Sequence, residues 1–136
     1  MDRRTKKKNE QAEALSWAVC DINTEEIIGC VGFQINKRHL HAELGYWIKK
    51  ELWNKGFCYE ATKTCLQYVF TQTSINKVFA QHFAKNPASG KVLQKLGMQK
   101  EGSFKEHYRK NGVFIDAKLY GLTKQEWNKQ ENRARE

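Results

Sequence analysis

The pattern of apolar and polar residues predicts three strands in the first half of the chain, two from aromatic and β-branched content and one from alternation. The first two segments are "LSWAVCD" at 15–21 and "IIGCVGFQ" at 27–34, and the polar "NTEE" between them predicts a turn. We expect these two segments to pair as an antiparallel hairpin. The third segment, "AELGYWIK" at 42–49, has the clearest period of two, with Ala42, Leu44, Tyr46 and Ile48 on one face and Glu43, Gly45 and Trp47 on the other.

The spacing of apolar residues changes to a helical period in "YEATKTCLQYVFTQ" at 59–72. Apolar residues recur there at intervals of three and four, so the segment predicts a helix with one buried stripe. That stripe consists of Ala61, Cys65, Leu66 and Val69. The following "INKVFAQHF" at 75–83 is rich in β-branched and aromatic residues and predicts another strand.

A second helix is predicted over "NPASGKVLQKLGM" at 86–98. Asn86 is a typical cap, Pro87 suits the first helical position, and Gly97 ends the segment. The residues expected on its buried face are Ala88, Val92 and Leu96.

The last third of the chain predicts a closing hairpin and a polar terminal helix. "QKEGSFKEHYR" at 99–109 and "FIDAKLYGL" at 114–122 flank Asn111-Gly112, a strong signal for a tight turn. Residues 123–136 predict a polar tail or helix, and residues 1–14 form a polar opening segment. The order of elements predicts an α/β (mixed α+β) fold, a mixed sheet with helices against it, in a single domain over 1–136.

The chain is basic, with 24 Lys and Arg against 15 Asp and Glu in 136 residues and a net charge of +9. Such a charge favours a negatively charged partner. Much of it lies at the two ends, in "RRTKKK" and "KQENRARE", where charge is usually solvated. The aromatic residues fall at sheet positions rather than within a basic stretch, which disfavours nucleic-acid binding. A phosphate-bearing cofactor is a separate and better explanation for Lys55.

Several classes of protein are disfavoured. No apolar run approaches the ~18 residues that span a bilayer, and the opening segment has no apolar region of a secretory signal. We therefore expect a cytoplasmic protein without a membrane partner. The four cysteines have no C-x-x-C spacing and the His39-x-His41 pair lacks a nearby third ligand, so no metal site is expected. Disulfides are not expected in a reducing compartment, and Cys20 and Cys30 fit small buried thiols.

The stretch "ELWNKGFCYEA" at 51–61 carries the main chemical signal. A glycine loop between a strand and the start of a helix can bind phosphate through its backbone N–H groups, with the positive end of the helix behind them. Gly56 would let the backbone approach an anion, and Lys55 would add a mobile positive charge. The alternative is a plain turn. The spacing fits neither a Walker loop nor a dinucleotide fingerprint, which disfavours nucleotide hydrolysis and hydride transfer.

Three segments together resemble the GNAT N-acetyltransferase superfamily, and most closely its RimJ/RimL-like branch of ribosomal-protein N-terminal acetyltransferases. They are "HAELGYWIKKELWNKGFCYEA", "NKVFAQHFAKNPASGKVLQKLGMQKEG" and "NGVFIDAKLYGL", in order within residues 26–122. The resemblance implies a GNAT-like mixed, mostly antiparallel sheet with flanking helices. It also implies that acetyl-CoA (coenzyme A) donates an acetyl group to a primary amine, either a protein N-terminal amine or a small-molecule amine.

The resemblance also implies which residues bind the cofactor. The pyrophosphate loop would be Trp53, Asn54, Lys55, Gly56, Phe57 and Cys58, continuing to Tyr59. Backbone groups of Trp47, Ile48 and Lys49 would contact the pantetheine arm, as would Asn86, with Ser89 near the sulfur. Asn54 departs from the usual glycine but tolerates left-handed backbone angles, and Cys58 departs from the usual Gly or Ala, placing a thiol near a thioester.

The catalytic residues follow from the same resemblance. Glu43 is the first candidate for the base that takes a proton from the amine, and Glu106 and Tyr108 are second candidates. Many GNAT enzymes have a tyrosine acid in the second helix, where this chain has Leu93. Ser89 is therefore the expected proton donor, unless the thiolate leaves unassisted.

The front of the chain departs from the family, which usually begins with a strand and one or two helices over the acceptor pocket. Residues 1–14 would be the tail of such a helix. The chain would then be a shortened natural form or a fragment, or a second subunit, as in a homodimer, would complete the site. Two other functions stay open: an inactive acetyl-CoA-binding module and a basic nucleic-acid-binding domain. The net charge of +9 disfavours a polycationic acceptor and so favours a peptide or a small neutral one.

Overall fold

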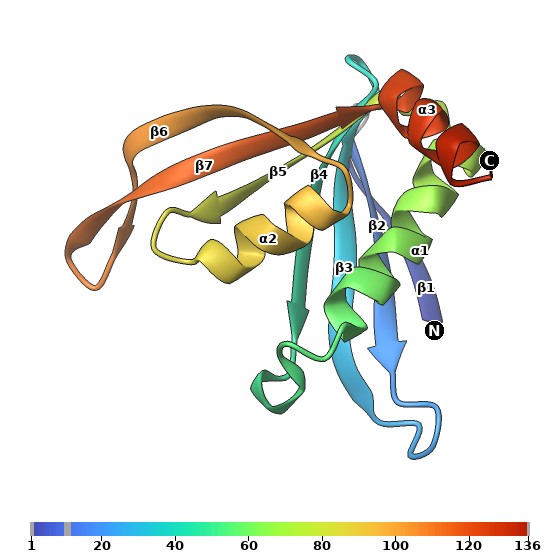
Figure 1. The fold of residues 1–136 in the computed structure, drawn as a ribbon, viewed down its shortest axis with the longest axis horizontal. Helices are drawn as coiled ribbons and strands as arrows, with labels where there is room; N and C mark the ends of the chain where they lie inside the picture. Colours follow the sequence, from blue (N-terminus) through green and yellow to red (C-terminus); the bar gives the residue numbers. More distant parts are fainter. Residues whose placement is uncertain (1, 10–11, 136) are drawn as a thin grey trace. The chain divides into compact units, whose positions relative to one another are not determined.

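Figure 1 shows a computed structural model that describes the backbone of residues 2–9 and 12–135 and the side chains of residues 13–135. The chain divides into two compact units, Met1–Asn76 and Lys77–Glu136. The expectation of one domain over 1–136 stays a prediction. The alternating segments, helices and hairpin predicted from the sequence are confirmed as elements of these units.

The described residues of the first unit form four strands, a short 3₁₀ helix and one α-helix. They are β1 (Asp2–Asn9), β2 (Ala12–Cys20), β3 (Ile27–Asn36), β4 (His41–Ile48), η1 (Lys50–Leu52) and α1 (Phe57–Gln72). The strands pair in the order β1-β2-β3-β4, each antiparallel to the next. Consecutive strands can pair in this way because their connections are short.

The core of the first unit lies between α1 and one face of this sheet. The helix contacts β3 and β4, and the Tyr68 ring lies 5.4 Å from the ring of Trp17 on β2. The alternation in β4 is confirmed, since Ala42 and Leu44 are buried while Gly45 is exposed. The predicted buried stripe of α1 is confirmed at Cys65, Leu66 and Val69, whereas Ala61 is only half-buried. The other buried residues of this helix are Thr62 and Phe70.

Two expectations for the first unit are wrong. The described residues of the segment 1–14 are not the tail of a helix, because Asp2–Asn9 forms β1 and pairs with β2. Backbone pairing with a neighbouring strand can order a polar segment without an apolar signature of its own. Cys20 and Cys30 are half-buried rather than buried; all four cysteines of the chain are free thiols.

The described residues of the second unit form three strands and two helices. They are β5 (Lys77–Phe83), α2 (Pro87–Lys95), β6 (Gln99–Lys110), β7 (Val113–Thr123) and α3 (Lys124–Ala134). The strands pair antiparallel in the order β5-β7-β6. The predicted Asn-Gly turn joins β6 to β7, with φ of 53° at Asn111 and 77° at Gly112. Two positive angles in succession match the right-handed twist of a hairpin.

The helix α2 begins and ends where the sequence predicts. Asn86 is the cap and accepts the Ser89 backbone N–H, and Gly97 follows the helix at φ 92°. The predicted buried face is confirmed at Leu96 and wrong at Ala88, which is exposed, and at Val92, which is half-buried; Gly90 and Leu93 are buried instead. A short helix in which small and large apolar residues occur on several sides does not fix its rotation through spacing alone.

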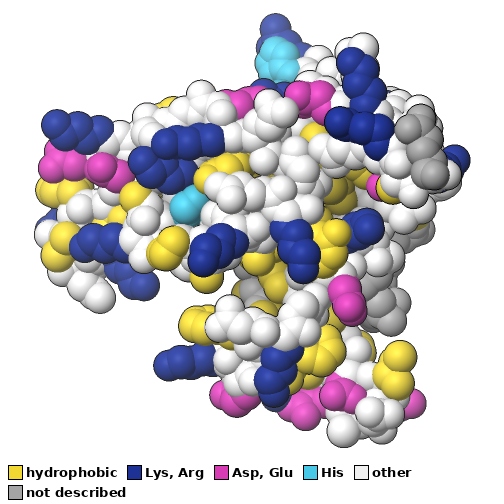
Figure 2. All heavy atoms as spheres, in the orientation of Figure 1, with side chains coloured by type: hydrophobic (Ala, Val, Ile, Leu, Met, Phe, Trp, Pro, Cys, Tyr) yellow, Lys and Arg dark blue, Asp and Glu magenta, His cyan; other side chains and the backbone are white. Residues whose placement is uncertain are grey.

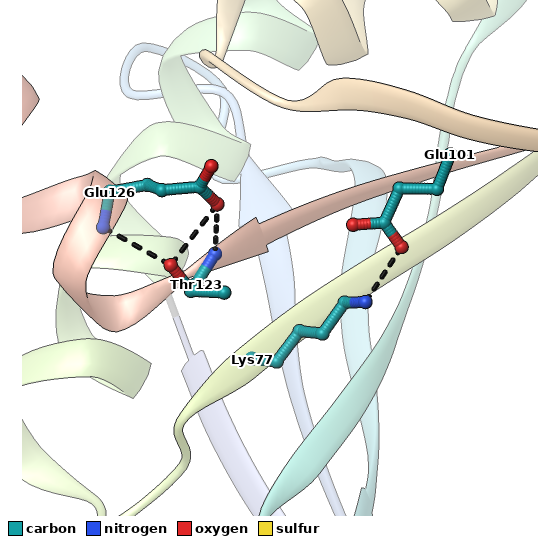
Figure 3. A network of polar contacts seen from close by, with 4 residues as sticks. All are labelled: Lys77, Glu101, Thr123 and Glu126. Atoms are coloured by element: carbon teal, nitrogen blue, oxygen red, sulfur yellow. Dashed lines mark hydrogen bonds and ion pairs between the residues drawn. The ribbon is translucent and has the colours of Figure 1, made fainter.

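The helix α3 confirms the predicted terminal helix and is fixed at its start by a capping box. The Thr123 hydroxyl accepts the Glu126 backbone N–H, and the Glu126 carboxylate accepts the Thr123 backbone N–H (Figure 3). Figure 3 also shows the ion pair between Lys77 of β5 and Glu101 of β6, with 2.6 Å between Nζ and Oε1. Such pairs at the surface contribute little to stability. The buried residue of α3 is Trp127, which packs the helix onto its unit.

Candidate functional site

Two residues of the loop between β4 and α1, Asn54 and Gly56, have left-handed backbone angles. Gly56 is the N-cap of α1 at φ 84°, and Asn54 has φ 63°. Among the described residues, no atom lies within 4 Å of where a Gly56 Cβ would be. The positive φ, rather than crowding, therefore requires glycine at position 56. The space beside it is open to a ligand.

The start of α1 has backbone donors without acceptors inside the helix. The first hydrogen bond of the helix runs from the Glu60 N–H to the Gly56 carbonyl, at 3.0 Å. The N–H groups before it, including those of Phe57 and Cys58, have no acceptor within the helix, as at every helix start. The helix end also carries roughly +0.5 of an elementary charge. An anion at this place would meet several donors and a favourable potential.

The end of β4 presents backbone groups beside the same loop. The Lys49 N–H donates to Ile28 of β3 at 2.8 Å, so the backbone groups of Ile48, one residue earlier, point away from β3. The Ile48 carbonyl accepts the indole N–H of Trp53 at 3.0 Å. Trp47 and Trp53 are 55% and 56% exposed.

Close contact between β3 and β4 fixes this strand end. A Cβ on Gly29 would lie 2.5 Å from the Trp47 carbonyl oxygen, closer than real Cβ atoms approach. Glycine at position 29 therefore lets the two backbones approach at the point where the resemblance implies cofactor contacts. This contribution of Gly29 is not evident from the sequence, where it is one of two glycines in an apolar run.

The charged and nucleophilic groups near the loop have distinct environments. The hydrogen bond to Glu26 raises the pKa of Lys49, and the two side chains form an ion pair. Lys55 is exposed, as a mobile positive charge beside an anion site would be. Burial raises the pKa of the Cys58 thiol. A thiol that stays protonated is a poor nucleophile, which answers the concern about a reactive group near a thioester.

The other sequence-predicted residues lie apart from this loop in the chain. Glu43 is half-buried on the face of β4 that also carries Gly45 and Trp47. Asn86 and Ser89 lie at the start of α2 in the second unit, where the Asn86 Oδ1 accepts the Ser89 N–H at 3.4 Å. Tyr108 lies on β6, and its hydroxyl donates to Gln81 Oε1 at 2.8 Å.

Comparison with known proteins identifies the family. A family model described as an acetyltransferase (GNAT) domain matches residues 1–99. The chain belongs to the GNAT acetyltransferase family. It is 32% identical to the uncharacterized N-acetyltransferase YoaA of Bacillus subtilis over 85% of this chain and 66% of that protein. It is 31% identical to the [ribosomal protein uS5]-alanine N-acetyltransferase of Escherichia coli over 88% of this chain and 62% of that protein.

A solved structure agrees with this GNAT assignment. The ribosomal-protein-S5-alanine acetyltransferase of Vibrio fischeri superposes with a TM-score of 0.79 and 28% identity, over 84% of this chain and 63% of that one. The likeness confirms the predicted mixed, mostly antiparallel GNAT fold and the RimJ/RimL-like branch. The chain spans about two thirds of the length of the curated GNAT relatives named above.

Two features of the GNAT chain were not evident from its sequence. Leu93, at the place of the tyrosine acid in many GNAT enzymes, is completely buried in the second unit, so its side chain belongs to the core. Gln81 accepts a hydrogen bond from the Tyr108 hydroxyl, and Asp116 accepts one from the Glu106 backbone N–H. Hydrogen bonds between strands cannot be recognised from the spacing of residues along the chain.

Within the described residues, no helix is long and apolar enough to cross a membrane, and no three metal-binding side chains form a cluster.

Proposed function

We propose that this chain binds acetyl-CoA at the loop Trp53–Cys58 and transfers the acetyl group to a primary amine. The observation that supports it best is Gly56, a left-handed N-cap with open space beside it and helix N–H groups behind it. A diphosphate needs several donors and a positive potential, and both meet at this point. The cofactor would supply an activated acetyl thioester.

The chain's own residues have separate tasks in this proposal. The amides from Asn54 to Tyr59 bind the pyrophosphate, with Lys55 as an additional cation. Of the predicted pantetheine contacts Trp47, Ile48 and Lys49, the Ile48 backbone points away from β3 and its N–H stabilises charge on the thioester oxygen, whereas the Lys49 N–H already donates to Ile28. Glu43 takes the proton of the attacking amine.

The residues of the second unit carry the remaining assignments, which come from the family resemblance. Asn86 binds pantetheine through groups that its capping bond to Ser89 leaves available, since an amide side chain has two donors as well as its acceptor. Ser89 donates the proton to the leaving thiolate, and Tyr108 is, with Glu106, a second candidate for the base. These roles stay predictions, because GNAT membership alone does not assign them.

We propose a protein N-terminal amine as the acceptor. The support is the resemblance to the uS5-alanine N-acetyltransferases of Escherichia coli and Vibrio fischeri. The net charge of +9 also disfavours polycationic small amines. We further propose that the enzyme is cytoplasmic. We also propose that a second copy of the chain, in a homodimer, supplies any acceptor contacts that this chain lacks. Sedimentation with and without a peptide acceptor tests the second copy.

Cofactor binding and transfer are tested separately. Coenzyme A at about 100 times its dissociation constant should raise the free energy of unfolding by about 2.7 kcal/mol. Turnover is then measured with a peptide that begins with alanine, the same peptide with a blocked N-terminus, and a small diamine. Transfer to the free peptide alone supports the proposal. Binding without transfer would identify an inactive cofactor-binding module, and no heat shift would contradict the proposed function.

A separate assay addresses nucleic-acid binding. Figure 2 shows Lys and Arg side chains in dark blue over the region where β6, β7 and α2 lie in Figure 1. A nucleic-acid-binding domain would be retained on DNA with a steep dependence on salt. We expect no such retention at physiological ionic strength.

A further inference from the structure

The ladder between β6 and β7 is irregular between Phe104 and Tyr108. Phe104 pairs with Ala117 and Tyr108 pairs with Ile115, so three residues of β6, at 105–107, lie opposite Asp116 alone. A regular antiparallel ladder would place one residue there. The strand β6 therefore bulges by two extra residues, a device that often redirects a side chain.

The bulge changes which side chain of β6 reaches across β7 to strand β5. Two regular steps from the Phe104–Ala117 pair would place Glu106 opposite Ile115. With the two extra residues, Tyr108 takes that position instead. Its hydroxyl donates to Gln81 Oε1 at 2.8 Å, and its ring lies 5.5 Å from the ring of Phe83. The register of β6 thus selects a phenol over a carboxylate at this place.

Asp116 holds the bulge in this form. Glu106 is in the left-handed region at φ 49°, which a residue with a Cβ adopts only when its surroundings favour it. Its backbone N–H donates to Asp116 Oδ1 at 2.7 Å. The backbone carbonyl of Asp116 accepts the Ala84 N–H at 2.9 Å. Asp116 therefore connects the residue that follows β5 to the strained residue of β6.

We propose that Asp116 is a positioning residue that keeps β6 in the register presenting Tyr108, rather than Glu106, beside Gln81. The hydrogen bond to a charged acceptor offsets the unfavourable backbone angle of Glu106. Without that acceptor, the left-handed angle of Glu106 is no longer offset, and the bulge no longer holds Tyr108 beside Gln81. The register of β6 is inferred from the hydrogen bonds and strand pairing of the second unit. Its effect on catalysis rests on the proposed acetyl transfer.

Contacts between aromatic protons in solution test the register directly. In the intact protein, the nuclear Overhauser effect should connect the rings of Tyr108 and Phe83. We expect the Asp116→Ala variant to lose this signal and Asp116→Asn to keep it, because asparagine retains the acceptor oxygen. A folded Asp116→Ala variant that keeps the signal would overturn the proposal, as would its loss in Asp116→Asn.

A second substitution separates register from general destabilisation. Glycine adopts a positive φ without the penalty of a Cβ. Glu106→Gly in the Asp116→Ala background should therefore restore the Tyr108–Phe83 signal. No restoration in a folded double variant would contradict a role for Asp116 in offsetting the angle of Glu106.

The catalytic consequence has its own readout. Asp116→Ala should lower kcat by on the order of 10²-fold, as expected for a displaced proton-transfer group, and Asp116→Asn should retain most of it. The dissociation constant for coenzyme A should not change, because Asp116→Ala removes the side-chain bond to Glu106 and leaves the backbone bond to Ala84, and neither residue is a predicted cofactor contact. Reduced coenzyme A affinity at unchanged kcat would overturn the positioning role. If the intact protein binds no coenzyme A, the proposed function fails, and the proton contacts still decide the register.

Discussion

The indole N–H of Trp53 donates a hydrogen bond to the carbonyl oxygen of Ile48, 3.0 Å away. The bond ties the loop that precedes α1 to the end of β4. Both residues are expected to contact the cofactor, so the bond connects the two parts of the proposed site in the first unit. A carbonyl oxygen has two lone pairs, and Ile48 can therefore keep this bond while a ligand approaches.

Removing that bond should loosen the loop. The Trp53→Phe variant keeps an aromatic ring without the N–H donor, and a typical hydrogen bond contributes about 0.5–1.5 kcal/mol. We expect the dissociation constant for coenzyme A to rise by up to about tenfold. Calorimetric titration measures it. An unchanged affinity would show that the bond does not organise the loop.

Substituting Gly56 should abolish cofactor binding. Alanine is disfavoured at φ 84°, so Gly56→Ala moves the N–H groups at the start of α1. The matched control is Gly112→Ala, which carries a similar strain at φ 77° in the β6–β7 turn. Both variants should lose about 1 kcal/mol of stability, and only Gly56→Ala should lose affinity for coenzyme A. Equal affinities in the two variants would argue against the loop as the binding site.

The stability of Asn54 variants should depend on how well each residue tolerates the left-handed backbone angle at this position. At φ 63°, Asn54→Gly should be neutral or slightly stabilising, and Asn54→Ala should cost about 1 kcal/mol. Urea unfolding with both variants checks this order. Equal stability of the alanine variant and the natural chain would show that the side chain, and not the angle, is selected at this position.

The buried thiol of Cys65 should make the fold sensitive to alkali. Cys65 is 1% exposed, and burial raises its pKa to about 12 from an ordinary value of 9.0. Between these values the unfolded chain loses the proton and the folded chain keeps it. The free energy of unfolding should therefore fall with pH, by at most about 1.4 kcal/mol per unit from this group.

Urea unfolding at pH 7, 9 and 10 measures that dependence. A Cys65→Ala variant is less stable at pH 7, because it leaves a cavity, but its stability should decline less between pH 9 and pH 10. The same decline in both proteins would assign the effect to other groups.

The sequence alone determined the order of elements and the chemistry of one loop. Alternation in 42–49, helical spacing in 59–72 and the Asn-Gly turn are local patterns, and each corresponds to an observed element. Gly56 was evident as the residue where the backbone needs freedom, because its neighbours place it between a strand and a helix.

Only the tertiary structure decided what depends on pairing between distant residues. The strand β1 exists because β2 offers it backbone partners, and its polar residues carry no apolar pattern. The rotation of α2 follows from what its neighbours cover. The bulge that puts Tyr108 in the place of Glu106 depends on Asp116 in another strand. Local patterns report each residue's own preference, whereas register and burial are set by partners that the chain meets only on folding.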